Sequence, residues 1–310
     1  MPIVPRTRRD GEVPPLLEQA AADARDALTD LINSREVETA RVHAELFRQY
    51  RDELERAFAA YMLVATPGGQ PRPAPVWDGL RLRQDGREAE LVESFRALID
   101  AMREVDTDAF TDMLSEAADD GFDRALYMMA LGGLDTAELL DRLPDDWETT
   151  LRDAGYDEVD WEQRLGFWGT DTSEKLRRWL TGTAVAGLPL TDTVNGYAAI
   201  TSGHTGHVEG LLGNELARAF GIGALLAMTL ARETFGDDAF VEVWLAKTDA
   251  SGRPDPLVCP VCAALHMTVT TKQPVDDTHP GCRCVRVPVP ANFTPVPGLS
   301  FESFRQGGGR

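Results

Sequence analysis

The sequence is poor in positive charge, in cysteine and in long hydrophobic runs. Its 310 residues include 51 aspartates and glutamates but only three lysines, at Lys175, Lys247 and Lys272, and the net charge is -20. A surface this acidic stays hydrated, and it repels bare DNA, because nucleic-acid binding requires clustered positive charge. The composition is typical of proteins from a very salty cytoplasm, although a GC-rich genome would also favour arginine over lysine.

No apolar run reaches the length of a membrane span, which needs about 20 residues. The longest run, Phe220–Ala231, is bounded by Arg218 and Arg232 and predicts a buried helix. A Walker-type phosphate loop, a nucleophile elbow and an HExxH helix are also missing, and no Ser/His/Asp set can be assembled. We therefore expect no membrane, no small-molecule substrate and no enzymatic activity.

All four cysteines lie in one short stretch, as Cys259-Pro-Val-Cys262 and Cys282-Arg-Cys284, with His279 just before the second pair. A gap of two residues in the first pair lets a tight turn aim both thiolates at one point. The second pair follows at a distance typical of structural zinc sites. We expect zinc as the cofactor, held by four of these five residues. Such a site has no open position for water, so it stabilises a fold and hydrolyses nothing.

Two ligand sets remain open. If Cys282 and Cys284 lie in an extended strand, their side chains share a face and all four thiolates bind the metal, with His279 supporting them from outside. We favour this set. The other set replaces Cys284 by His279 and leaves Cys284 as a free thiol. Two disulfides are a further alternative, but no secretion signal opens the chain, and a reducing compartment disfavours them.

This stretch resembles the C-terminal signature of the phage Mu F-like family, the minor head or head morphogenesis proteins of tailed viruses. The matching residues are Trp244, Asp249, Cys259, Pro260, Cys262, Leu265, His279, Pro280, Cys282, Arg283 and Cys284. Upstream, Thr229-Leu-Ala-Arg232 is similar to the family's Thr-Glu-x-x-Arg-Ala helix, with Leu230 in place of the acid. His266 stands near a position where the family usually has glycine. The specific match covers about the last fifth of the chain.

The resemblance implies a structural minor head protein that assists head assembly or genome delivery. Its implied partners are the portal protein or the major capsid protein, with packaged DNA bound only weakly. Its implied location is the virion head near the portal vertex, and the host cytoplasm during assembly; the acidic composition suits a host with a high-salt cytoplasm. Two alternatives are a zinc-ribbon module that binds nucleic acid or regulates, which the net charge disfavours, and a toxin or effector enzyme joined to a head-protein domain.

The expected fold is mainly α (α+β), with helical N-terminal and central regions and a small C-terminal antiparallel β element stapled by zinc. The expected segments are a flexible arm at 1–15, a helical hairpin or long helix at 16–65, a linker at 66–79, a helical region at 80–165, a Mu F-like head-protein domain at 166–290 with its zinc motif at 259–284, and an extended tail at 291–310. The aromatic residues of the tail either pack back onto the domain or dock on a neighbour.

Apolar residues at steps of three and four predict the first helix. They are Leu17, Ala21, Ala24, Leu28 and Leu31, followed by Ala40, Ala44, Phe47, Leu54, Phe58 and Tyr61. Asn33 with Glu36 resembles a capping box, which predicts a break between the two runs.

The region after residue 166 is expected to hold three helices and three strands. Asp171 with Glu174 predicts a helix start, a second helix follows Leu190, and a third begins near His207. Gly221 and Gly223 are expected to interrupt the third helix. The strands are expected at 240–246, 267–271 and 285–289. His204 and His207, with Glu209, offer either a second metal site or a loop and helix-cap cluster, and we favour the cluster.

Overall fold

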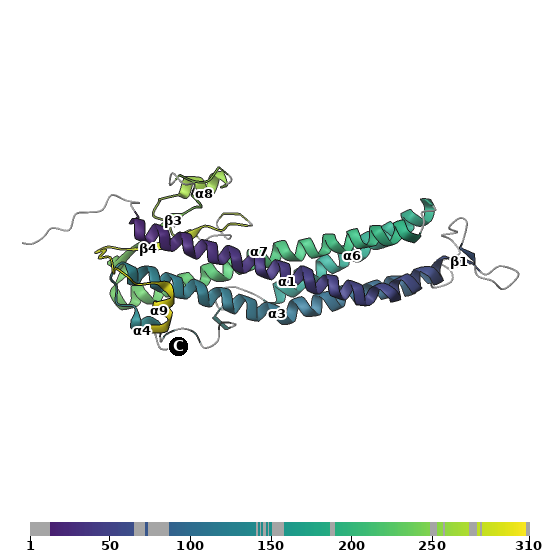
Figure 1. The fold of residues 1–310 in the computed structure, drawn as a ribbon, viewed down its shortest axis with the longest axis horizontal. Helices are drawn as coiled ribbons and strands as arrows, with labels where there is room; N and C mark the ends of the chain where they lie inside the picture. The colour runs from purple at the N-terminus through teal and green to yellow at the C-terminus, as the bar shows by residue number, and fades with distance from the viewer. Residues whose placement is uncertain are drawn as a thin grey trace, which may run out of the picture. The chain divides into compact units, whose positions relative to one another are not determined.

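The protein is described here from a computed structural model. The structure describes residues 13–64, 72–73, 87–140, 142, 144, 147, 149–150, 158–186, 190–248, 253–256, 258–272, 278–279 and 281–307. Its helices are α1 (Pro15–Met62), α3 (Arg87–Leu131), α4 (Ala137–Leu140), α6 (Glu158–Ala186), α7 (Leu190–Phe235), the 3-10 turn η1 (Asp237–Ala239), α8 (Pro260–Leu265) and α9 (Phe301–Gly307) (Figure 1). The expectation of a mostly helical chain is confirmed.

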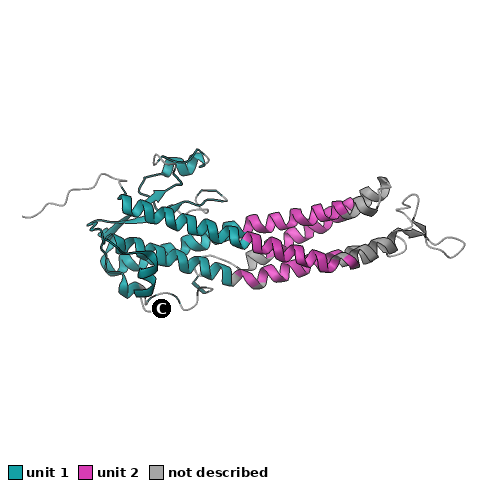
Figure 2. Cartoon of the chain, in the orientation of Figure 1, with its two compact units in different colours: residues 1–35, 111–156, 212–310 teal, residues 36–110, 157–211 magenta. Residues whose placement is uncertain are grey.

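The chain folds into two compact units, which are coloured separately in Figure 2. Unit 1 contains residues 1–35, 111–156 and 212–310, and unit 2 contains residues 36–110 and 157–211. Each unit therefore draws on segments that are far apart in the sequence. The long helices α1, α3 and α7 contribute residues to both units, whereas α6 lies within unit 2 and the C-terminal elements lie within unit 1.

Helix α1 is continuous, so the predicted break at Asn33–Glu36 is wrong and the long-helix alternative is right. The first apolar run is buried as predicted at Leu17, Ala21, Ala24 and Leu28. After Ile32 the buried positions are Thr39 and His43, while Ala44 is exposed. The inward-facing stripe thus continues without a break, but polar residues occupy part of it, and apolar periodicity alone does not detect them.

Helices α6 and α7 are also continuous. Asp171 does not cap a helix: it lies inside α6 and pairs with Lys175 one turn later, at 2.6 Å. His207 does not begin a helix either, because α7 runs unbroken from Leu190 through Gly221 and Gly223 to Phe235.

The glycines of α7 and α3 permit a close helix crossing within unit 1. A methyl group at Gly223 would lie 2.7 Å from the carbonyl carbon of Ala118 on α3. A methyl group at Gly121 on α3 would lie 2.8 Å from the carbonyl carbon of Phe220 on α7. Both distances are far below an ordinary carbon–carbon contact of about 3.5–4.0 Å. Gly121 and Gly223 are therefore needed where the two backbones meet, and they do not act as helix breakers.

A small antiparallel sheet in unit 1 joins β3 (Phe240–Leu245) to β4 (Val285–Pro290), with Trp244 opposite Arg286. The strand expected at 267–271 is reduced to a single bridge between Val243 and Val269. Its backbone still follows β3, because Trp244 N donates to Thr268 O and Thr270 N donates to Glu242 O, at 2.9 and 3.0 Å. A second two-stranded sheet pairs β1 (Leu63–Val64) with β2 (Arg72–Pro73).

The C-terminal tail is not extended throughout, because residues 301–307 form helix α9. Phe301 and Phe304 pack against Tyr127 of α3, with ring centroids 5.4 and 5.8 Å apart. Arg305 forms an ion pair with the fully buried carboxylate of Asp123, at 3.0 Å. Of the two expectations for the tail, the structure has the one in which it packs back onto its own unit.

Two expected segments lie mainly outside the described residues: the arm at 1–15, except its last three residues, and the linker at 66–79, except Arg72–Pro73. Helix α7 contains a stretch, Asn195–Phe235, long and apolar enough to cross a membrane, with a mean hydropathy of 1.3 in its most apolar window. Buried core helices pass the same test, and 61% of that window is buried here, so the stretch is weak evidence of a span.

Candidate metal centre

The Cys-Pro-Val-Cys segment forms a tight turn at the start of α8. Cys259 is the N-cap residue, and Pro260 occupies the first turn, where a missing N–H costs nothing. The backbone N–H of Cys262 donates to Cys259 Sγ at 3.3 Å. A sulfur that accepts a backbone N–H is stabilised as a thiolate, the form that binds metals. The turn therefore places two donor atoms side by side, as the sequence predicts.

The second half of the cluster comes from the loop before β4. The strand expected at 285–289 is present as β4, and Cys282 and Cys284 precede it, so the condition that both cysteines lie in a strand is not met. Gly281 has a φ of 79°, a left-handed conformation that favours glycine. Its N–H donates to the Asn214 side-chain oxygen on α7. Helix α7 thus holds the loop that carries Cys282.

The five candidate ligands converge in two overlapping groups, in each of which all donor atoms lie within 4.8 Å of one another. One group contains Cys259, Cys262 and His279, and the other contains Cys262, Cys282 and Cys284. Cys262 belongs to both, and its sulfur lies 3.4 Å from His279 Nε2 and 3.7 Å from Cys282 Sγ. The cluster could therefore hold a metal ion, and both four-ligand sets remain open.

These separations match the edges of a coordination tetrahedron. Metal–sulfur bonds of about 2.3 Å and metal–nitrogen bonds of about 2.0 Å give edges of about 3.8 Å between sulfurs and about 3.5 Å between sulfur and nitrogen. A disulfide would instead require a sulfur–sulfur distance of about 2.05 Å. All four cysteines are free thiols in the structure, so it does not contain the two disulfides of the alternative interpretation.

Without a cation beside them, the buried sulfurs of Cys262 and Cys284 favour the neutral thiol form. Burial raises the pKa of Cys262 to about 12. Hydrogen bonding with Cys282, followed by burial, raises the pKa of Cys284. Closely packed buried thiols cannot all ionise on their own, because the thiolates would repel one another. A bound metal reverses this, since a coordinated thiol is deprotonated outright.

The surroundings of the cluster form a small core. Trp244 is fully buried beside Ala246 and three of the cysteines, and Val258 and Leu265 pack against them. Trp244, Pro260 and Leu265 are three of the residues that match the family signature. They therefore shape the cluster without being candidate metal ligands. Asp249 and Pro280 lie outside the described residues.

Sequence reasoning missed an ionic network next to this core. The Glu242 carboxylate on β3, which is 3% exposed, pairs with Arg286 of β4 at 2.6 Å and with Arg232 of α7 at 2.5 Å. Arg232 also lies over the Phe240 ring, 4.8 Å from its centroid. The sequence offers Arg232 as the boundary of an apolar run and as a match to the family's helix, and neither observation predicts this pairing. Through Arg232 and Glu242, this network links α7 to the sheet.

The turn after α8 carries unfavourable backbone geometry. Met267 has a φ of 61°, which non-glycine residues rarely adopt. Its N–H donates to Trp244 O at 2.8 Å, so the bridge to β3 holds it in place.

The cluster lies beside a cavity of about 310 Å³ within unit 1. The five candidate ligands line one part of it. The other lining residues are Arg25, Asp26 and Thr29 of α1, with Lys247, Asp255, Val258, Gly281 and Arg283 from the C-terminal element.

The suggested second metal site at His204 and His207 is not among the groups of potential ligands in the described part of the chain. His204 is buried in α7, and its Nδ1 lies 3.2 Å from Thr172 Oγ1. His207 stacks on Trp168, with ring centroids 5.7 Å apart. Both histidines are inside a helix, so the loop and helix-cap interpretation is wrong as well.

Instead, unit 2 contains a buried polar network that sequence reasoning did not find. His43 Nε2 contacts both carboxylate oxygens of Asp106, at 3.0 and 3.1 Å, and its Nδ1 lies 3.0 Å from Thr205 Oγ1. The ring of His204 stacks on that of His43 at 6.2 Å. Burial raises the pKa of Asp106, and the hydrogen bond from His43 opposes the increase. The partners lie 63 and 162 residues from His43, which no local pattern links.

His204 makes unit 2 sensitive to acid. Burial, with repulsion from His43, His207 and Lys175, lowers the pKa of His204 from 6.5 to about 4. Between these values the unfolded chain binds more protons at this position than the folded chain does. The contribution of His204 to stability is therefore complete above pH 6.5 and is lost as the pH falls toward 4.

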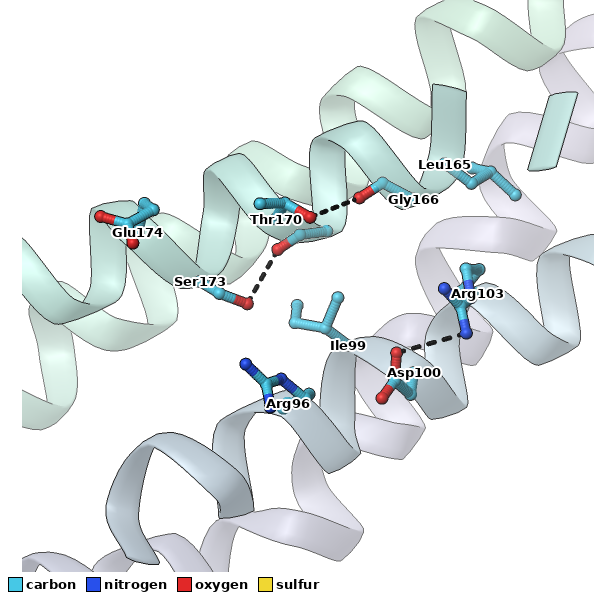
Figure 3. Close-up of a pocket in the computed structure, with 10 residues that line it drawn as sticks. Arg96, Ile99, Asp100, Arg103, Leu165, Gly166, Thr170, Ser173 and Glu174 are labelled. Atoms are coloured by element: carbon cyan, nitrogen blue, oxygen red, sulfur yellow. Dashed lines mark hydrogen bonds and ion pairs between the residues drawn. The ribbon is translucent and has the colours of Figure 1, made fainter. Parts of the chain in front are cut away.

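A second cavity, of about 350 Å³, lies between α3 and α6 within unit 2 (Figure 3). Arg96 and Arg103 face it from α3, and each pairs with an acidic residue one turn earlier, at 3.4 and 3.5 Å. Gly166 of α6 also lines the cavity, and a methyl group at this position would meet nothing within 4 Å. Asp100 and Glu174 also line it, so its two basic residues are balanced by two acidic ones. This lining favours no ligand of a single charge.

Comparison with protein-family models, with curated proteins and with solved structures finds no match.

Proposed function

We propose that the protein is a structural component of the head of a tailed virus, and that one zinc ion holds its C-terminal element together. The observation that carries the zinc assignment is the convergence of four free cysteines and one histidine at distances that suit a tetrahedral site. Thiolate and imidazole donors in a tetrahedron favour zinc or an iron–sulfur centre over calcium or magnesium.

A structural role for the metal follows from the number of donors and from their setting. Five donors are present for four positions, so protein side chains can fill the coordination shell and leave no place for a reactive water. Cys262, Cys282 and Cys284 are buried. A pair of strands such as β3 and β4 is marginal by itself, and a bound metal supplies folding free energy that so small a core lacks.

The assignment to a virus head is supported by the resemblance of the Cys-Pro-x-Cys and His-Pro-x-Cys-Arg-Cys segments to the Mu F-like family. The buried position of Trp244 and the partly buried position of Leu265 around the cluster agree with this, because the residues shared with the family are those that a metal-held element needs. We propose the portal protein or the major capsid protein as the partner, the virion head as the location, and no enzymatic activity. The net charge of -20 favours a protein partner over DNA.

The test is co-assembly. The protein would be co-expressed with a portal protein and a major capsid protein from the same genome, and assembled heads would be isolated by sedimentation. We expect a few copies per head, retained after a salt wash. A protein absent from the heads would contradict the proposal. Tight, salt-sensitive DNA binding in a mobility-shift assay would favour a zinc-ribbon regulator instead, and toxicity on expression would favour an effector enzyme.

A further inference from the structure

Arg25 is a buried cation with weak compensation in its own surroundings. Its side chain is 10% exposed, and its Nη1 donates to Ala246 O at a long 3.4 Å. Its ion pair is with Asp26, at 3.8 Å, and the Asp26 side chain is 74% exposed. An ion pair with so exposed a partner contributes little, whereas removing a guanidinium from water is costly. The position therefore calls for a stronger negative charge.

The cavity that Arg25 lines also contains the five candidate metal ligands. Ala246, whose carbonyl oxygen accepts the hydrogen bond from Arg25, belongs to the same small core as Cys262, Cys282 and Cys284. A divalent metal bound by four thiolates carries a net charge of about −2, and one bound by three thiolates and a neutral histidine carries about −1. With either ligand set the loaded centre is an anion beside a buried guanidinium.

We propose that Arg25 is the counter-charge of the metal–thiolate centre, and that metal binding thereby docks the first turns of α1 onto the C-terminal element. Arg25 is not a ligand and acts by stabilising the deprotonated sulfurs from outside the coordination shell. Because coupling between two events is reciprocal, the metal stabilises the docking of α1 as much as the docking stabilises the metal. This inference rests on the proposed metal centre and extends it to a part of the chain more than 230 residues before the first ligand.

Zinc affinity, measured by competition with a chromophoric chelator on the full chain, tests the proposal. We expect Arg25→Gln to weaken zinc binding by about 10- to 100-fold, the range typical of residues that support metal ligands. Arg25→Lys keeps the charge and should retain most of the affinity. The control, Arg48→Gln, removes an exposed arginine further along α1 that pairs with Glu45, and it should bind zinc as the wild type does.

Amide hydrogen exchange over residues 20–32 provides a second readout, which does not depend on any variant folding. In the wild type, removal of zinc should reduce protection in this segment of α1. Unchanged protection would overturn the proposal, as would wild-type zinc affinity in Arg25→Gln or an equal loss of affinity in Arg48→Gln. A wild-type protein that binds no zinc at all would instead refute the metal centre itself, so the two failures are distinguishable.

Discussion

Alanine substitution at two glycines of the same helix should change the free energy of unfolding in opposite directions. Gly221 and Gly223 both lie in α7, and alanine favours a helix over glycine by about 1 kcal/mol at an unobstructed position. Gly221 is such a position, because a methyl group there would meet nothing within 4 Å. Gly221→Ala should therefore stabilise the protein by about 0.5–1 kcal/mol.

At Gly223 the same methyl group meets the backbone of α3. It would lie 2.7 Å from the carbonyl carbon of Ala118, so the helices must separate by about 1 Å to restore a normal contact. Such overpacking costs about 1–3 kcal/mol or more, and a backbone carbonyl, unlike a flexible side chain, cannot move aside. After the gain in helix propensity is subtracted, Gly223→Ala should destabilise the protein by about 1–2 kcal/mol.

Urea denaturation followed by circular dichroism measures both effects as shifts in the transition midpoint. The wild type, the two single variants and Gly121→Ala would be compared at one pH and one zinc concentration. Gly121→Ala should behave like Gly223→Ala, because it meets the carbonyl of Phe220 at the same crossing. If both α7 variants were stabilising, α3 and α7 would not be in backbone contact at this point, and the reasoning would be refuted.

Three further predictions concern pH, backbone conformation and the C-terminal helix. Replacing His204 by Gln should reduce the loss of stability between pH 7 and pH 4 by about 3 kcal/mol, because the low pKa of His204 no longer contributes. Denaturation midpoints across this range measure the effect, and an unchanged loss of stability would contradict it. Met267 has a φ of 61°, so the Met267→Gly variant should be at least as stable as the wild type, and the Met267→Val variant should be less stable by about 1 kcal/mol or more. Equal melting temperatures for the two variants would argue against the left-handed turn. Arg305→Met should destabilise the protein by about 1–2 kcal/mol and expose α9 to limited proteolysis, because the buried Asp123 loses its ion pair with Arg305. The control, Gln306→Ala on the exposed face of α9, should have neither effect.

The features that the sequence predicts well are those set by neighbouring residues. Two cysteines separated by Pro-Val specify a turn that places both sulfurs together, and the structure has this turn at the start of α8. The alternating residues of 240–246 form β3, and the apolar stripe from Leu17 to Leu28 forms the first part of the core.

The features that the sequence misses depend on distant partners. His43 is buried in α1 because Asp106 and Thr205 pair with it, so a residue that appears to interrupt the apolar stripe in fact continues it. Gly223 appears to break a helix, but Ala118 of α3 explains its presence. The Glu242 network likewise joins three elements that no local pattern connects. The choice between the two ligand sets also stays open, since both Cys284 and His279 lie next to Cys262.

In the proposed metal centre, the cysteines are thiolates gathered around one metal ion. The direct measurement is the metal content of protein purified without chelators, together with the absorption spectrum after exchange for cobalt. We predict about one zinc per chain, a tetrahedral thiolate–cobalt spectrum, and loss of both in Cys262→Ser, whose sulfur belongs to both groups of ligands. A metal-free protein, or an intact mass lower by about 4 Da than that of the reduced chain, which would indicate two disulfides, would contradict the claim.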